Sequence, residues 1–163
     1  MAMTNNSNDQ RWMRAALLQS RYAQGQTAPN PAVGCVIIRD DVLVGRGRTA
    51  LGGRPHAETE AVADAGDLTH GATAYVTLEP CAHHGQTPPC AEALITAGIA
   101  RVVIGALDPD ERVAGQGVAI LKKAGIDVST GILADQCQEV LAGYLKTRTD
   151  KRPMVTVKIA TSL

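Results

Sequence analysis

Two stretches of the sequence decide the fold and its site. The first is Pro55-His56-Ala57-Glu58, and the second is Glu79-Pro80-Cys81-Ala82-His83-His84-Gly85-Gln86-Thr87-Pro88-Pro89-Cys90. One His and two Cys are three protein ligands for a tetrahedral zinc, and they leave the fourth position to water. A carboxylate beside such a metal can help to activate that water. The sequence therefore predicts a zinc site made by His56, Cys81 and Cys90, with Glu58 next to it.

The composition is that of a globular domain. The chain has 163 residues, which is the usual length of one domain, and 45% of them are hydrophobic. With one Trp, three Tyr and no Phe, the core must consist of Val, Ile, Leu and Ala. Sixteen acidic and sixteen basic residues balance, so the chain lacks the basic footprint of a nucleic-acid binder. The sequence contains no run of eighteen apolar residues, so no segment of it suggests a membrane span.

The polar N-terminus and the four cysteines bear on the compartment. Residues 1–9 lack a basic segment followed by an apolar one, so we expect a flexible tail rather than a secretory signal. Four Cys could form two disulfides in a secreted protein. Without a signal we favour the reducing cytoplasm, where Cys more often bind metal or pack in the core. Cys35 and Cys137 lie in apolar and helical patterns, and we expect both to be structural.

Helical and strand-like patterns alternate along the chain. They predict helices at 9–23, 57–65, 91–97, 117–124 and 133–147, and strands at 33–39, 42–47, 72–78, 101–106 and 127–130. The first two strands flank Asp40-Asp41 and read as a hairpin. This order predicts an α/β fold, in which the sheet is largely parallel after its hairpin and carries helices on both faces.

The C-terminal segment stands apart from this pattern. Residues 154–159 alternate as a new strand would, shortly before the sequence ends at Leu163. Two interpretations remain open. Either the chain is cut at the entrance of a second domain, which we favour, or its last strand joins an edge of the sheet.

The positions of the four site residues suit the chemistry. Pro55 favours a helix start, so His56 lies at the first turn of the 57–65 helix. There it need not be fully helical, and both His56 and Glu58 can reach one cavity although they are two positions apart. Cys90 opens the next helix, whose N-terminus favours the thiolate that binds metal.

Less specific interpretations compete for several residues. His83 or His84 could supply a fourth ligand and close the site into a structural zinc centre. Glu79 could accept hydrogen bonds from backbone amides of its own loop. Asn30, between two prolines, could simply form a turn. The carboxylate of Glu58 favours catalysis over structural zinc.

A wider set of motifs carries a family resemblance. The segments Thr27-Ala28-Pro29-Asn30-Pro31-Ala32-Val33-Gly34, Pro55-His56-Ala57-Glu58, Tyr75 to Cys90, Asp108-Pro109 and Val113-Ala114-Gly115 occur in one order. They resemble the N-terminal deaminase domain of the bifunctional riboflavin biosynthesis deaminase/reductase. In zinc-dependent base deaminases generally, H-x-E is followed by P-C-x-x-C. Here eight residues separate the two Cys, and this longer loop is the most specific mark of the resemblance.

The resemblance implies a three-layer α/β/α cytidine deaminase-like fold with a mixed five-stranded sheet. It divides the chain into a tail at 1–9, a zinc-dependent pyrimidine deaminase domain at 10–150, and at 151–163 a linker with the first strand of a truncated reductase domain. NADPH would serve only that missing domain. A cytoplasmic homo-oligomer without nucleic-acid or membrane partners is expected.

The implied reaction is hydrolytic deamination of 2,5-diamino-6-ribosylamino-4(3H)-pyrimidinone 5′-phosphate to 5-amino-6-(5-phosphoribosylamino)uracil. By the family pattern, His56, Cys81 and Cys90 hold one zinc per chain, and Glu58 moves protons between water, ring nitrogen and leaving amine. The pattern implies four substrate-binding positions: Asn30, Thr49, His83 and Gln86. The family often has His in place of Thr49 and Lys or Arg in place of Gln86, so this chain lacks a cation at the mouth of the site.

Two alternatives stay open at this stage. One is a zinc deaminase that acts on another nucleobase or nucleoside. The other is a non-catalytic zinc-binding module. Glu58 speaks against the second, because a binding module has no use for a carboxylate aimed at water on the metal.

Overall fold

The computed structural model describes residues 3–83, 88–109 and 114–161. Five strands form one sheet in the order β2-β1-β3-β4-β5. The helices are α1 (Met3–Ala23), α2 (Ala57–Ala65), α3 (Cys90–Thr96), α4 (Gln116–Lys123), α5 (Ala134–Val140) and α6 (Ala142–Asp150), and the strands are β1 (Gly34–Arg39), β2 (Val42–Arg48), β3 (Thr73–Leu78), β4 (Arg101–Ala106) and β5 (Asp127–Thr130). Short 3₁₀ turns occupy Leu51–Gly53 and Gly66–Thr69.

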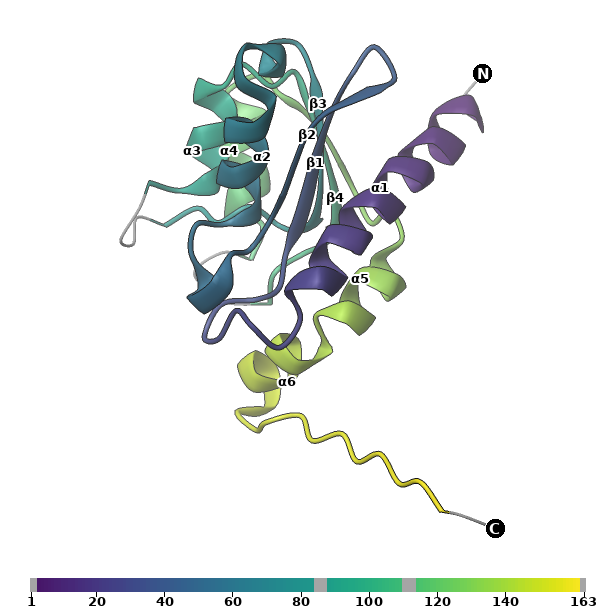
Figure 1. The fold of residues 1–163 in the computed structure, drawn as a ribbon. Coiled ribbons are helices and arrows are strands. Elements are labelled where there is room, and N and C mark those ends of the chain that lie inside the picture. Colours follow the sequence, from purple (N-terminus) through teal and green to yellow (C-terminus); the bar gives the residue numbers. More distant parts are fainter. Residues whose placement is uncertain (1–2, 84–87, 110–113, 162–163) are drawn as a thin grey trace.

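The fold class expected from the sequence is confirmed. Strand β1 pairs antiparallel with both β2 and β3, whereas β3, β4 and β5 are mutually parallel, so the sheet is mixed. Helices α2, α3 and α4 cover one face, and α1 and α5 cover the other (Figure 1). Asp40 and Asp41 both have positive φ (51° and 59°), which suits the tight turn of the predicted hairpin.

Most side chains of the core are aliphatic, as the composition predicts, and Trp12 and Tyr75 are also buried in it. Among the largest fully buried ones are Met13, Ile37, Leu78, Leu94, Ile104 and Leu121. Cys35 and Cys137 are also completely buried, in agreement with their predicted structural role. The thiol of Cys137 packs against Gly105 on β4, where a Cβ would collide with it.

The first helix begins earlier than its periodicity predicts. We expected a flexible tail through residue 9, but α1 starts at Met3. The carboxylate of Asp9 is buried and accepts two hydrogen bonds from Arg101 (2.8 and 2.9 Å) and one from the Tyr75 hydroxyl (2.9 Å). Burial raises the pKa of Asp9, but these bonds outweigh it and the net pKa is lowered. An ion pair to β4 that the local sequence does not reveal thus ties the N-terminal half of the helix to the sheet.

The last helix is also different from its prediction. The expected single helix at 133–147 is two helices, α5 and α6, that meet at Leu141. The carbonyl of Val140 accepts a hydrogen bond from the Gln24 side chain (2.9 Å). This contact from a distant part of the chain lies at the junction, where α5 ends and α6 begins.

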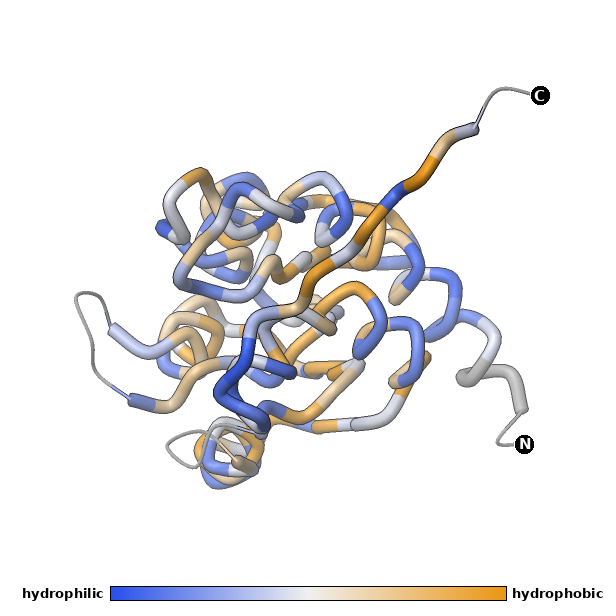
Figure 2. Tube along the Cα trace, turned by 90° about the horizontal axis from the view of Figure 1, so that it is seen from below, coloured by the Kyte–Doolittle hydropathy of each residue, from blue (hydrophilic) through white to orange (hydrophobic). Residues whose placement is uncertain are grey.

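The C-terminal segment does not join the sheet. Residues 153–161 form neither helix nor strand, so the alternative in which they pair at a sheet edge is wrong. Figure 2 shows this segment running away from the rest of the chain, with apolar residues along it. Val155, Val157 and Ile159 are about three-quarters exposed or more (79%, 74% and 81%).

Glycines in the hairpin allow the helices to lie directly on it. A Cβ on Gly34 would collide with the backbone of α1, and a Cβ on Gly45 or Gly47 would collide with the backbone of α2. Gly47 faces the carbonyl of Ala57 and the amide of Ala61. Because Ala57 lies between His56 and Glu58, this close approach sets the position of both site residues.

We expect Gly47→Ala to lower the free energy of unfolding by about 1–3 kcal/mol, because backbone atoms cannot rotate away from the added methyl group. Denaturant unfolding measures the change. Thr59→Ala, on the exposed side of α2, is the control and should shift stability by less than about 0.5 kcal/mol. A Gly47→Ala protein as stable as the control would show that strand and helix do not pack this closely.

Candidate metal centre and adjoining pocket

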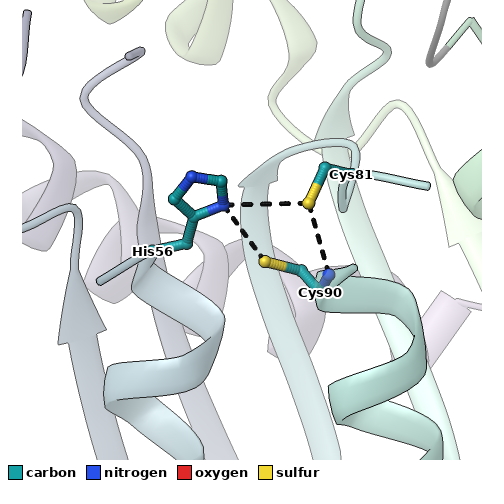
Figure 3. A group of neighbouring side chains, drawn as sticks. All are labelled: His56, Cys81 and Cys90. Carbon is teal, nitrogen blue, oxygen red and sulfur yellow. Dashed lines mark hydrogen bonds between the residues drawn. The ribbon is translucent and has the colours of Figure 1, made fainter. Parts of the chain in front are cut away.

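Three predicted ligands meet at one point between α2 and α3. The Nδ1 atom of His56 lies 3.3 Å from the Cys90 sulfur and 3.7 Å from the Cys81 sulfur (Figure 3). His56 is the residue just before α2, Cys90 is the first residue of α3, and Cys81 lies in the loop after β3. The backbone amide of Cys90 donates to the Cys81 sulfur at 3.2 Å, which holds the two cysteines together.

These distances fit a zinc ion. Zinc–nitrogen bonds of about 2.0–2.1 Å and zinc–sulfur bonds of about 2.3 Å, at tetrahedral angles, place nitrogen and sulfur about 3.6 Å apart. The two observed separations, 3.3 and 3.7 Å, bracket this value. The other ring nitrogen of His56, Nε2, is buried and has no hydrogen-bond partner in the described residues. Nδ1 is therefore the atom that the geometry offers to a metal.

A structural zinc centre would need a fourth protein ligand in place of water. Within the described residues, the group of candidate ligands has three members, His56, Cys81 and Cys90, and His83 is not among them. His84 lies outside the described residues. The described geometry thus gives a three-ligand set, the number found in catalytic zinc sites.

The two thiols differ in their acidity. Hydrogen bonds from Cys90 and then His56 outweigh burial and lower the pKa of Cys81 to about 4. The hydrogen bond with Cys81, followed by burial, raises the pKa of Cys90. The protein alone thus stabilises one thiolate, and a cation is needed to favour the second.

Glu58 is the buried carboxyl group beside this set. It lies in the first turn of α2 and is only 4% exposed. Burial, followed by the charge of Cys81, raises its pKa to about 7, although His56 opposes the shift. A carboxyl group whose pKa is near neutral can both accept and donate a proton at physiological pH.

A pocket opens in front of these residues. Its lining includes His56, Glu58 and Cys81. It also includes three of the predicted substrate-binding residues, which are Asn30, Thr49 and His83. The fourth, Gln86, lies outside the described residues. The Thr49 hydroxyl donates to the Pro31 carbonyl (2.9 Å) and accepts from the Val33 amide (3.0 Å). The Asn30 side-chain nitrogen donates to the Gly53 carbonyl (2.7 Å). Both side chains therefore also shape the pocket wall.

Sequence reasoning missed several residues of the same lining. These are Arg54, Tyr144 and Arg148, and Asp108 was noted only as part of a motif. Tyr144 and Arg148 come from α6, which belongs to no motif, and only the tertiary fold brings them to the pocket.

Glu79 holds the backbone at the far wall of the pocket. Its carboxylate accepts hydrogen bonds from the amides of Gly115 (3.0 Å), Val118 (3.2 Å) and Asp108 (3.4 Å). This bears out the interpretation that Glu79 binds backbone amides, although the amides belong to a later segment of the chain. The buried carboxylate thereby fixes the start of α4 and the second residue after β4.

We expect Glu79→Gln to lower the free energy of unfolding by about 1–3 kcal/mol, because an amide NH₂ group would face backbone donors that need an acceptor. Denaturant unfolding measures the loss. Glu60→Gln, the same change at an exposed position on α2, is the matched control and should leave stability nearly unchanged. Equal stability of the two variants would contradict the role given to Glu79.

Comparisons with known proteins agree with this geometry. Residues 6–106 match the model of the cytidine and deoxycytidylate deaminase zinc-binding region. The riboflavin biosynthesis protein RibD of Escherichia coli is 47% identical over 155 residues, which are 95% of this chain and 42% of that protein. The diaminohydroxyphosphoribosylamino-pyrimidine deaminase of Buchnera aphidicola is 47% identical over 139 residues, which are 85% of this chain and 95% of that protein.

The same likeness extends to three dimensions. The structure of Acinetobacter baumannii RibD (form 2) superposes with a TM-score of 0.85 at 50% identity, covering 89% of this chain and 41% of that one. The chain thus spans about two fifths of the RibD proteins that it matches. In the part of the chain that the structure describes, no helix is long and apolar enough to cross a bilayer.

Proposed function

Because this chain belongs to the cytidine and deoxycytidylate deaminase zinc-binding family and, within it, to the RibD-type deaminases, we propose that it removes an amino group from a ribosylaminopyrimidine phosphate. The substrate is 2,5-diamino-6-ribosylamino-4(3H)-pyrimidinone 5′-phosphate. Water supplies the oxygen that replaces the 2-amino group, and ammonia leaves. Residues 10–150 form the deaminase domain in this proposal.

One observation is the main support for a catalytic role of this site. A buried carboxyl group, Glu58, with a pKa of about 7 lies beside a three-ligand set of one imidazole and two thiols. A purely structural metal site has no need of an acid/base group at this place. The 47% identity to a deaminase of nearly the same length supports the choice of substrate.

In the proposed mechanism, His56, Cys81 and Cys90 hold zinc. When bound, zinc supplies a Lewis acid that lowers the pKa of water at an open position. Glu58 accepts one proton from water and donates it to the ring nitrogen. It then takes the remaining proton of the added hydroxyl group and donates it to the amine, which leaves as ammonia. Asn30 and His83 contact the ring or ribose from the pocket wall, and Gln86 completes the substrate-binding set.

A substrate panel tests this proposal. Ammonia release is measured from the ribosylaminopyrimidine phosphate and, in parallel, from cytidine, cytosine and guanine, with zinc-loaded protein. We expect the ribosylaminopyrimidine phosphate to be preferred by orders of magnitude in kcat/KM. A preference for one of the other three would support the alternative of a nucleobase or nucleoside deaminase, and no turnover at all would support the non-catalytic zinc module.

A further inference from the structure

The proposed substrate carries a phosphate, and the sequence lacks the cation that relatives often have at position 86. A phosphate dianion is costly to bury without a cationic partner. Two arginines occur among the described residues that line the pocket, Arg54 and Arg148. The two differ in their position relative to the metal centre.

Arg54 belongs to the metal end of the pocket. It is two residues from His56, and both residues line the pocket. A phosphate bound there would lie beside the reacting ring, whereas the ribose must separate the two groups. Arg54 is therefore a poor choice for the phosphate of this substrate.

Arg148 lies at the other side of the pocket, where it adjoins an open groove. The pocket and the groove share four lining residues, Asn30, Pro31, Tyr144 and Arg148. None of the metal ligands nor Glu58 lines the groove. A ligand whose ring reaches Glu58 would thus leave its far end at this junction, where a charged group can keep part of its hydration.

The side chain of Arg148 is held in place by packing. Its guanidinium carbon lies over the Tyr144 ring, 5.2 Å from the ring centre. The Tyr144 hydroxyl donates to the buried carboxylate of Asp108 (3.1 and 3.3 Å to the two oxygens), which lies just beyond β4. The end of the sheet thereby positions Tyr144, and Tyr144 in turn supports Arg148. A guanidinium presents its N–H donors in one plane, as a fork whose geometry matches a phosphate.

We propose that Arg148 binds the 5′-phosphate of the substrate and sets the preference for a phosphorylated riboside, with Tyr144 as its positioning residue. This inference rests on the proposed function. It assigns the missing cation to α6, whose residues belong to no motif of the active site.

The test compares two substrates in wild type and Arg148→Gln. These are the ribosylaminopyrimidine phosphate and the same riboside without phosphate. We expect Arg148→Gln to lower kcat/KM for the phosphorylated substrate about 10- to 100-fold, the factor of one hydrogen bond to a charged group, mainly through KM. The value for the unphosphorylated riboside should stay within about 2-fold, because no contact of Arg148 is lost with it.

Two further variants test whether the effect is specific to the guanidinium of Arg148. Arg148→Lys keeps the charge but not the planar fork, so an intermediate loss is expected. Lys146→Gln removes a cation two positions away on the same helix, where the lysine pairs with Asp150 outside the pocket. This control should leave both substrates unaffected. An equal loss for both substrates, or no loss for either, in Arg148→Gln would overturn the inference, and Arg148→Lys decides if the Gln variant does not fold.

A binding measurement separates this inference from the proposed function. Ribose 5-phosphate is titrated into wild type and Arg148→Gln, and binding is followed by NMR shifts or calorimetry. If wild type deaminates neither riboside, the proposed function fails. Loss of ribose 5-phosphate binding in Arg148→Gln would still support the phosphate site, and equal binding by both proteins would refute it.

Discussion

Replacing Glu58 by Gln is expected to lower kcat by about 10²–10⁴-fold, the usual contribution of one positioned acid/base group. The amide has nearly the same shape but cannot accept a proton from water. Because Glu58 is 4% exposed and its pKa is raised to about 7, the neutral amide removes a charge that burial already disfavours. We therefore expect zinc content and stability to be retained. Steady-state ammonia release, metal analysis and thermal unfolding measure the three properties.

Glu60→Gln provides the matched control for this experiment. Glu60 also lies in the first turn of α2, but it is exposed and absent from the pocket lining. Its change should leave kcat within about 2-fold, as surface substitutions usually do. A Glu58→Gln protein that keeps more than about a tenth of the wild-type rate would be incompatible with a proton-transfer role for this residue.

Replacing Cys81 by Ser is expected to abolish zinc binding and activity together. The Cys81 thiol has a pKa of about 4, which makes it the ligand that is ready to bind a cation, and a Ser hydroxyl does not ionise in this range. The variant should also lose the stability that metal binding adds, about 4 kcal/mol when free zinc is about 1,000 times Kd. Metal analysis and thermal unfolding with added zinc measure both effects.

A chelator and a second cysteine complete the test. Wild type stripped of metal should unfold at nearly the temperature of Cys81→Ser, because both lack the ion. Cys137→Ala changes a buried cysteine outside the site, so it should retain zinc while losing some stability to the cavity. Wild-type zinc content in Cys81→Ser would show that the ligand set is assigned incorrectly.

Local sequence patterns predicted the helices and strands that are determined by residues close to them in the sequence. The bounds of α2, β4 and β5 agree with the prediction, because punctuating residues and apolar runs define them locally. The break between α5 and α6 could not be predicted, since it coincides with a hydrogen bond from Gln24, over one hundred residues earlier. The pairing of Asp9 in α1 with Arg101, ninety-two residues later, could likewise not be predicted from local patterns.

The candidate site likewise has residues that local motifs predicted and residues that only the tertiary fold brings in. The metal ligands and Glu58 lie in two short motifs, so spacing alone indicated that they would meet. The Tyr144–Arg148 pair has no such signal, because only the tertiary fold brings α6 to the pocket. For Glu79, the sequence offered hydrogen bonds to backbone amides of its own loop as one interpretation, but its partners near α4 depend on the tertiary fold.

The dependence of ammonia release on bound zinc tests the central claim most directly. Metal-free wild type is titrated with zinc, and the rate with the ribosylaminopyrimidine phosphate is measured at each metal content. We expect the rate to rise in proportion to bound zinc and to stop rising at about one ion per chain, the content of a single three-ligand site. Full activity in the metal-free protein, or no ammonia release at full zinc occupancy, would contradict the account.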